Sequence, residues 1–196
     1  MKLLVHSCDS RKWLWEHWEK CFKRSGWDID YEFIDGEEAF TDQMKKALER
    51  ETDEYIFYTL DDYFIREPID FNKYWDMAHD LKVDALRLQP GVQFNSLPYR
   101  FDPGYNVTEF YRFEENEGLL KQTRESAYHI SMQTSIWRRD YLLKCIIPGL
   151  NPWEFEGVNM GERLGDVYWV PSLPRWYIDG VRKGILLDAA KPIIYD

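Results

Sequence analysis

The sequence predicts an α/β protein with a Rossmann-like mixed sheet flanked by helices, in a single domain of residues 1–196. Strand-like and helix-like segments alternate over residues 1–88, as in proteins whose parallel strands are joined by helices. The run Tyr55–Leu60 is rich in aromatic and β-branched residues, which is typical of a strand buried on both faces. A chain of 196 residues is also long enough to bury one continuous core.

The segments before this central strand alternate in type. Lys2–Cys8 is predicted to be a strand, the next helix ends at Gly26, and Ile29–Ile34 is a second strand. Thr41–Asp42 is expected to cap a second helix that runs to about Glu51. The apolar faces of the two helices consist of Leu14, Trp18, Cys21 and Phe22, and of Met44, Ala47 and Leu48.

The pattern changes after the third helix. Asp70 is expected to cap that helix, and Val83–Leu88 returns as a strand. Gln89–Gly104 is dense in Pro, Gly, Asn and Tyr, which predicts a long irregular segment such as a flap. Glu114–Glu125 is highly charged and is either a solvated hairpin or a short helix. Further strands are predicted at Val107–Phe113, Tyr128–Gln133 and Asp166–Val170.

The last third of the chain holds a helix, a loop and a basic tail. The helix is predicted over Trp137–Ile147 and is ended by Pro148–Gly149. Asn151–Glu156 follows it and is interpreted as an extended loop. Near the end, Trp176–Ile185 contains a basic pair between two glycines.

Composition limits the possible functions. The formal net charge of −10 and an isoelectric point near 5.0 argue against broad binding to nucleic acid or anionic lipid. Aromatic residues make up 17% of the chain, which suits a site that stacks on planar or sugar rings. The three cysteines have no paired spacing, which indicates a reducing compartment. The apolar run Met1–Val5 is too short for a signal or spanning segment, so we expect a cytoplasmic protein.

Two adjacent carboxylates, Asp61 and Asp62, follow the central strand directly. Ligands of open α/β sheets lie beyond the carboxyl ends of the strands, where such a pair can hold Mn²⁺ or Mg²⁺ against a phosphate. Acidic residues in this position also act as turn formers or helix caps, so both interpretations stay open. Arg87 ends an apolar strand and therefore requires an anionic partner, for which Asp62 is the candidate.

Other polar residues are expected at the same edge of the sheet. If the strands are parallel, Ser7, Cys8 and Asp9 in the first loop would touch a bound nucleotide, although Asp9 also fits as a helix cap. Asp35, after the second strand, either contacts base or ribose or forms a plain turn. The first loop lacks Gly-x-Gly-x-x-Gly, which argues against an NAD-type site.

Four stretches together resemble a known family. They are Met44–Phe64, Arg87–Leu88, Ile130–Leu143 and Pro148–Glu156, and the tail Val181–Gly184 adds to them. The specific part is the order Ile-Trp-Arg-Arg-Asp-Tyr-Leu, Pro-Gly and Pro-Trp-Glu-Phe-Glu within the last two stretches. The chain resembles small bacterial and phage glycosyltransferase-like proteins with the GT-A fold, the fold of nucleotide-diphospho-sugar transferases.

The resemblance implies that a nucleotide-diphosphate sugar is the donor. Asp61 and Asp62 then correspond to the Asp-x-Asp motif, in which a carboxylate helps to hold Mn²⁺ or Mg²⁺ against the diphosphate. The spacing departs from that motif, because Tyr63 follows the pair. One carboxylate is therefore expected to face the metal and the other the ribose or sugar, without a fixed assignment. Metal-independent relatives also exist, which leaves the ion itself open.

Glycosyl transfer requires a cation for the leaving diphosphate and, with inversion, a base for the acceptor hydroxyl. Arg182 and Lys183 are candidates for the cation, unless they form a solvated turn. Glu154 and Glu156 are candidates for the base. In an extended loop they would point the same way, and we favour Glu156.

Three residues are expected on the acceptor side, namely Trp153, His129 and Gln133. Trp153 lies beside the candidate bases, where it can desolvate them or anchor the loop in the core. His129 also fits as a core histidine, because the four histidines show no metal-ligand spacing.

Three functions remain open. The first is a glycosyltransferase in which residues 1–88 bind the nucleotide sugar and residues 89–196 supply the acceptor and catalytic groups. Its acceptor would be a surface glycan, a lipid-linked sugar or a hydroxylated DNA base, and the acidic charge disfavours the last. The second is a binding module for nucleotide sugars or glycans, and the third a metal-dependent nucleotidyltransferase or phosphohydrolase. The acidic pair together with both glutamates favours the first, because a binding module needs no base.

Overall fold

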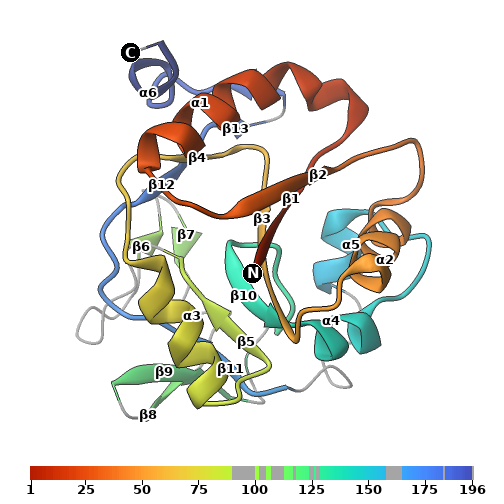
Figure 1. The fold of residues 1–196 in the computed structure, drawn as a ribbon, viewed down its shortest axis with the longest axis vertical. Helices are drawn as coiled ribbons and strands as arrows, with labels where there is room; N and C mark the ends of the chain where they lie inside the picture. Colours follow the sequence, from red (N-terminus) through yellow and green to blue (C-terminus); the bar gives the residue numbers. More distant parts are fainter. Residues whose placement is uncertain are drawn as a thin grey trace.

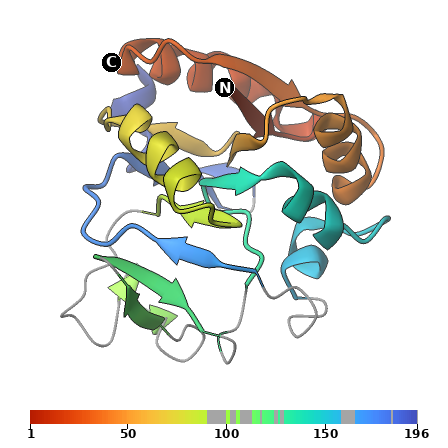
Figure 2. The ribbon, with the colours of Figure 1, turned by 60° about the horizontal axis from the view of Figure 1, so that its bottom comes forward.

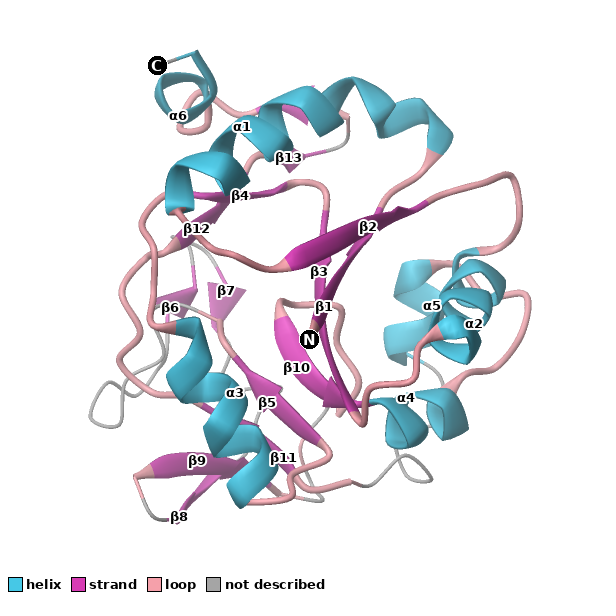
Figure 3. Cartoon of the chain, in the orientation of Figure 1, coloured by secondary structure: helices cyan, strands magenta, loops and turns pink. Residues whose placement is uncertain are grey.

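The fold is built around one eight-stranded mixed sheet with helices on both faces (Figure 1). The computed structural model describes residues 1–89, 100–101, 105–106, 113–116, 118–123, 126, 129–157, 165–182 and 184–195. Figure 3 shows helices on either side of the central strands. The predicted class, a Rossmann-like mixed sheet flanked by helices, is confirmed.

The strands follow the order β2-β1-β3-β10-β5-β11-β9-β8 across the sheet, from β2 at the top of Figure 2 to β8 and β9 at the bottom. Their bounds are β1 Lys2–His6, β2 Asp30–Ile34, β3 Tyr55–Leu60, β5 Ala85–Arg87, β8 Phe113–Asn116, β9 Leu119–Gln122, β10 Ser135–Arg138 and β11 Val167–Trp169. Strand β1 pairs in parallel with both β2 and β3, as the alternation of strands and helices predicts. Strand β10 is antiparallel to both of its neighbours, β3 and β5.

Shorter strands and the helices complete the fold. The short strands are β4 Tyr63–Ile65, β6 Arg100–Phe101, β7 Tyr105–Asn106, β12 Tyr177–Asp179, β13 Val181–Arg182 and β14 Ile185–Leu186. The helices are the 3₁₀ helix η1 Asp9–Leu14, α1 Trp15–Ser25, α2 Phe40–Arg50, α3 Phe71–Asp80, α4 Arg139–Cys145, α5 Pro152–Gly157 and α6 Lys191–Tyr195. Two predicted helix ends are confirmed. Gly26 ends α1 with a φ of 71°, and Asp70 caps α3 by accepting a hydrogen bond from Lys73 N.

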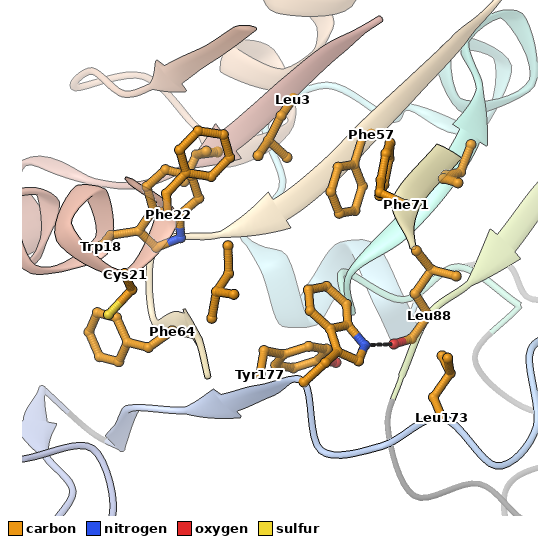
Figure 4. Close-up of a cluster of buried hydrophobic side chains, with 14 of the residues drawn as sticks. Leu3, Trp18, Cys21, Phe22, Phe57, Phe64, Phe71, Leu88, Leu173 and Tyr177 are labelled. Atoms are coloured by element: carbon orange, nitrogen blue, oxygen red, sulfur yellow. Dashed lines mark hydrogen bonds between the residues drawn. The ribbon is translucent and has the colours of Figure 1, made fainter. Parts of the chain in front are cut away.

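Each face of the sheet packs against its own hydrophobic cluster. Successive residues of β3 point to opposite faces, so Tyr55 and Phe57 belong to one cluster and Ile56 and Tyr58 to the other. The first cluster also includes apolar residues of α1, α3 and α6, and the second includes residues of α2, α4 and α5. Figure 4 shows part of the first cluster, in which the Trp176 indole donates a hydrogen bond of 2.7 Å to the Leu88 carbonyl.

The strand expected at Tyr128–Gln133 is wrong in its position. Residues 129–134 are not a strand, and the strand is β10, which also takes the first two residues of the helix expected at Trp137–Ile147. Trp137 is fully buried between β3 and β5. The Ser-Ile-Trp sequence therefore gains more from completing the sheet than from extending α4.

The starting points of helices α5 and α2 correct two other expectations. Asn151–Glu156 is not an extended loop, because α5 begins at Pro152. Helix α2 begins at Phe40 without a side-chain cap, so Thr41 lies inside it. The Thr41 hydroxyl accepts a hydrogen bond of 3.0 Å from Leu150 N, which ties α2 to the segment before α5.

The described part of the charged stretch Glu114–Glu125 belongs to a hairpin. Strands β8 and β9 pair antiparallel, and Gly118 in the turn has a φ of 80°. A short helix is thereby excluded for residues 113–116 and 119–122. Most of the flap expected at Gln89–Gly104, and most of the strand expected at Val107–Phe113, lie outside the described residues.

Candidate functional site

The acidic pair lies at the carboxyl edge of the central strands, where the loops after β1 and β3 meet. Asp61 N donates a hydrogen bond of 3.1 Å to the carbonyl of His6, which joins the two loops. The Asp61 side chain is fully buried, and the Asp62 side chain keeps 14% of its exposure. The two residues form the turn between β3 and β4, and their carboxylates are buried there instead of facing water. Buried carboxylates require partners.

The first loop supplies the partners of both carboxylates. Ser7 Oγ donates a hydrogen bond of 2.5 Å to Asp61 Oδ2, and the Trp15 indole fixes that hydroxyl from 2.8 Å. Arg11 Nη1 donates to Asp62 Oδ2 at 2.6 Å, and its Nη2 lies 3.3 Å from Asp61 Oδ1. One guanidinium is therefore shared between two carboxylates.

This single cation does not balance the pair. Burial raises the pKa of Asp61 to about 6, although Arg11 and Ser7 limit the rise. Burial also raises the pKa of Asp62 to about 7, against the opposing effect of Arg11, and the neighbouring Asp61 and Asp179 carboxylates add to the rise. The site therefore favours the binding of further positive charge.

The residues fit a metal ion only if the substrate completes its coordination. Among the described residues no group of three or more His, Cys, Asp or Glu side chains could hold an ion alone. Asp62 Oδ1 is buried and has no hydrogen-bond partner in that part of the chain. Mg²⁺ is often held by one or two carboxylates together with substrate phosphates. The oxygen Asp62 Oδ1 suits that arrangement.

The C-terminal segment closes one side of the site. Gly180 N donates a hydrogen bond of 2.7 Å to the Asp62 carbonyl. A Cβ at Gly180 would lie 2.0 Å from a Phe64 ring carbon, so only glycine permits this approach. Arg182 lies two residues farther along, in β13, and Lys183 lies outside the described residues.

Glu156 and the acidic pair act on the same tyrosines. Burial raises the pKa of Tyr58 well above its ordinary value, and the carboxylates of Glu156 and Asp61 raise it further. Burial likewise raises the pKa of Tyr63, with contributions from Asp62 and Glu156 among others. Carboxylates from α5 and from the loop after β3 thus contribute to the raised pKa values of the same two tyrosines.

The two glutamates of α5 differ in position. Glu156 Oε1 accepts a hydrogen bond of 2.6 Å from Met132 N, which fixes its carboxylate. Glu154 lies at the exposed start of the helix, where its Oε2 accepts from Asn151 N at 3.0 Å while Asn151 Oδ1 accepts from Glu154 N. This reciprocal pair is a capping box. The expectation that both glutamates point the same way fails, because residues two apart on a helix face different directions.

The first loop also holds the other candidate nucleotide contacts. Cys8 is partly exposed and lies 3.2 Å from the Ser10 hydroxyl. Lys12 bridges Asp9 and Asp35, at 2.8 and 2.5 Å, so the loops after β1 and β2 meet as well. Ser7, Cys8, Asp9 and Asp35 therefore share the edge on which the acidic pair lies.

The remaining candidates are more scattered. Arg87 is fully buried, donates to the His129 carbonyl at 2.8 Å and lies 5.0 Å from the centre of the Trp169 ring. The ion-pair partner of Asp62 is Arg11, where we expected Arg87. His129 is itself buried, and its Nε2 donates to the Thr123 carbonyl at 2.8 Å, as suits a core histidine.

Two candidates for the acceptor side differ in exposure. Trp153 is 79% exposed on α5, so it does not anchor this segment in the core. Gln133 is half-buried and accepts a hydrogen bond of 3.1 Å from the Tyr177 hydroxyl.

The sequence placed Arg11 in the first loop without pairing it with the acidic residues, and it gave Asp179 and Tyr58 no role in the site. Arg11 carried a usable signal, since it is the one basic residue in Ser7–Arg11, opposite two adjacent acids. Tyr58 lies inside an apolar run and carried none. Its hydroxyl lies 2.6 Å from His6 Nδ1, and burial lowers the pKa of that imidazole to about 3.

Comparison with known proteins places this geometry in a wider fold group. No family model and no curated protein sequence match the chain. HddC from Yersinia pseudotuberculosis, complexed with GMP-PN, superimposes with a TM-score of 0.55 at 9% identity, over 93% of this chain and 95% of HddC. The chain has a GT-A-like fold.

Two other solved structures support that conclusion. Residues 1–349 of S. aureus TarS give a TM-score of 0.53 at 13% identity, over 90% of this chain and 59% of that TarS chain. A197 from STIV gives 0.52 at 15% identity, over 87% of this chain and 81% of A197. The chain thus spans about three-fifths of the TarS chain that it matches. Likeness at this level establishes the fold and not the reaction. None of the helices in the described part of the chain is long and apolar enough to cross a bilayer.

Proposed function

We propose that this protein is a glycosyltransferase that moves a sugar from a nucleotide-diphosphate sugar to an acceptor hydroxyl. The proposal rests on the Arg11 guanidinium that holds Asp61 and Asp62 at the carboxyl edge of the sheet. It rests also on Glu156, whose carboxylate contributes, with those of Asp61 and Asp62, to the raised pKa values of Tyr58 and Tyr63. A site that only binds a nucleotide sugar needs no carboxylate in the position of a base. The structures of TarS with UDP and of HddC with GMP-PN support a nucleotide-linked donor.

The donor is held at the edge formed by the first two loops. In this proposal Ser7, Cys8, Asp9 and Asp35 contact the nucleoside, and Asp61 contacts the ribose or sugar. Asp62 is the ligand of Mn²⁺ or Mg²⁺ through its buried Oδ1. Such an ion supplies charge neutralisation for the diphosphate when it is bound. Arg87 supports this edge from within the core.

The leaving diphosphate requires cations from the chain as well. Arg11 is the cation already placed against both carboxylates. Gly180 contacts the Asp62 carbonyl, and Arg182 and Lys183 come two and three residues after Gly180 in the chain. We assign all three to the diphosphate, because charge that develops on its oxygens is stabilised by fixed cations.

Glu156 is assigned as the base. Its Oε1 is fixed by Met132 N, which orients Oε2 as the proton acceptor. The acceptor hydroxyl gives its proton to Glu156 while its oxygen bonds to the anomeric carbon, and the bond from that carbon to the diphosphate breaks. The exposed Trp153 ring is assigned to stacking against a glycan acceptor, and the half-buried Gln133 to the same acceptor. His129 is not assigned to the acceptor, because it is buried and its ring donates to the Thr123 carbonyl. Glu154 is not assigned as a base, because it caps α5.

The test of donor binding is a thermal shift screen of UDP-, GDP- and other nucleotide sugars, with and without Mn²⁺. A ligand at 100 times its dissociation constant stabilises the fold by about 2.7 kcal/mol. We expect Asp62→Asn to lose the Mn²⁺-dependent part of the shift, and Asp76→Asn, on the exposed face of α3, to keep it. An unchanged shift in Asp62→Asn would remove the metal from the proposal.

The test of transfer uses Glu156→Gln with the donor found in that screen. The variant should bind the donor as the wild type does and lose release of the nucleoside diphosphate. Full turnover by this variant would place the base elsewhere. Tight binding of a simple nucleoside triphosphate, without binding of nucleotide sugars, would instead indicate a nucleotidyltransferase.

A further inference from the structure

A second pocket lies away from the acidic pair, at the opposite end of α1 from Arg11. Its volume is about 260 Å³. Three segments meet there: the last turn of α1, the end of β4 with the turn after it, and α6, which lies beside α1 in Figure 1. The residues that line it include Arg24, Ile65, Arg66, Pro68, Pro192 and Ile193.

The walls of this pocket are fixed by backbone contacts. Arg66 N and Glu67 N donate to the Trp176 carbonyl, at 2.7 and 3.1 Å. Arg24 Nη2 donates to the Ile193 carbonyl and lies 3.4 Å from the Cys21 sulfur, which holds the guanidinium against α6. Pro68, in the turn after β4, and Pro192, in α6, stiffen these walls. The backbone around the pocket is therefore held in place by contacts within the chain.

Its charge is opposite to that of the whole chain. The chain has 35 acidic and 25 basic residues, yet Arg24 and Arg66 line the pocket and none of the described lining residues is acidic. Arg66 lies 3.5 Å from its neighbour Glu67, and both side chains are half exposed, so this pair is weak. Arg24 has no carboxylate within ion-pair distance in the part of the chain that the structure describes. Both guanidinium groups have donors left for an anion.

We propose that this pocket binds a small phosphate monoester whose alcohol part is compact and apolar. A phosphate monoester carries about −1.5 to −2 charges at neutral pH, which matches two guanidinium groups, whereas a carboxylate matches one. The apolar walls, Ile65, Pro68 and Pro192, suit the alcohol part. The volume lies below the range of roughly 300–1,000 Å³ for drug-sized ligands, so the ligand is compact.

Both arginines are required for this binding. The pocket lies at the C-terminal end of α1, where the helix dipole has about half a negative charge and repels an anion. A single guanidinium must offset this repulsion as well as bind the phosphate. Loss of either arginine should therefore remove most of the affinity, and not half of it.

The experiment is a calorimetric titration of the full chain with phenyl phosphate. Arg24→Gln and Arg66→Gln should each weaken binding at least tenfold. The matched control is Lys23→Gln, which removes one positive charge from the same turn of α1 and leaves the pocket intact, since Lys23 does not line it. Because Arg24 also holds α6, Arg66→Gln is the deciding variant if Arg24→Gln unfolds.

Other ligands separate this pocket from simple charge attraction and from the donor site. Benzoate and inorganic phosphate should each bind at least tenfold more weakly than phenyl phosphate, and an excess of UDP should not displace it. The proposal is overturned by equal weakening in Lys23→Gln, by equal binding of benzoate, by displacement with UDP, or by no binding at all. Weak or absent binding of phenyl phosphate does not bear on the glycosyltransferase assignment, which concerns the other end of α1. Displacement by UDP would instead place phenyl phosphate in the donor site.

Discussion

Asp61 and Asp62 are two buried carboxylates whose negative charge is only partly balanced by neighbouring cations. They share one guanidinium, that of Arg11, and a third carboxylate, Asp179, acts on Asp62 from the C-terminal segment. A ligand that brings a cation relieves this imbalance, which is a direct reason for binding at this point. The same imbalance predicts how stability depends on pH.

Stability should fall as pH rises through the range in which these carboxyls titrate. Their pKa values, about 6 and about 7, lie above the ordinary value of 3.8, so the folded state holds protons that the unfolded state has released. This loss of stability is absent below about pH 4 and complete above about pH 7. We therefore expect the unfolding free energy of Asp62→Asn, relative to wild type, to increase over that window.

Urea unfolding at a series of pH values measures this difference. Asp76→Asn, which removes an exposed carboxylate of α3, is the control and should show a much smaller trend. A difference that is constant from pH 4 to pH 8 would mean that Asp62 is not held in its buried state.

Arg11→Gln should destabilise the fold by about 2–3 kcal/mol near pH 8. Breaking a buried ion pair costs about 3–5 kcal/mol, and the value is lower here because the Arg11 side chain keeps 26% of its exposure. Chemical denaturation of Arg11→Gln, Asp62→Asn and the double variant measures their coupling. Additive effects of the two substitutions would contradict the ion pair.

At the scale of elements, α5 shows how a short helix positions one functional residue. Asn151 caps the helix from outside, and the six helical residues begin with Pro152 at the first position and have Glu154 closing the capping box. This cap sets the helix, and the helix places Glu156 against Met132 N. The sequence Asn-Pro-Trp-Glu carried this signal, because proline is favoured at the first position of a helix.

Glu154→Ala should lower stability by about 1 kcal/mol through loss of the cap. Transfer should decrease only as far as α5 frays, whereas Glu156→Gln should lose transfer without loss of stability. Thermal unfolding and turnover measured on both variants separate the two roles. Equal loss of turnover at wild-type stability in Glu154→Ala would restore Glu154 as a candidate base.

Gly180→Ala tests the contact between the C-terminal segment and the acidic pair. The new Cβ would lie 2.0 and 2.2 Å from two carbons of the buried Phe64 ring, so β12 and β13 must shift. We expect a loss of about 1–3 kcal/mol, as for other overpacked positions, and weaker nucleotide-sugar binding. Gly157→Ala is the control, because a Cβ there has no atom within 4 Å. Wild-type stability and binding in Gly180→Ala would show that the approach is not tight.

At the scale of the whole molecule, β10 joins the two halves of the chain. It comes from residues 135–138 and inserts antiparallel between β3 and β5, both of which belong to residues 1–88. Residues 1–88 therefore cannot complete their sheet without the second half. We therefore expect the chain to fold as one unit.

Trp137→Ala should destabilise both halves together. Trp137 is fully buried in the middle of the sheet, and loss of a buried aromatic side chain costs about 3–5 kcal/mol. Urea unfolding followed by far-ultraviolet circular dichroism and by fluorescence should give coincident transitions in the variant and in the wild type. Separate transitions would mean that the two halves fold independently.

The sequence by itself determined the elements whose signals are local. The alternation of strands and helices in residues 1–88, the cap at Asp70, the stop at Gly26 and the acidic pair at a strand end all follow from neighbouring residues. Periodicity and capping act over a few residues, so they can be recognised without the fold.

Only the tertiary structure decided which residues meet. Ser-Ile-Trp is a strand because it pairs with both β3 and β5, which are distant in the sequence. Arg11 is the partner of Asp62 because the loops after β1 and β3 adjoin. The carboxylate of Glu156, on a helix far along the chain, contributes to the raised pKa of Tyr58. Such contacts depend on burial and on pairing between distant segments, and no local pattern of residues encodes them.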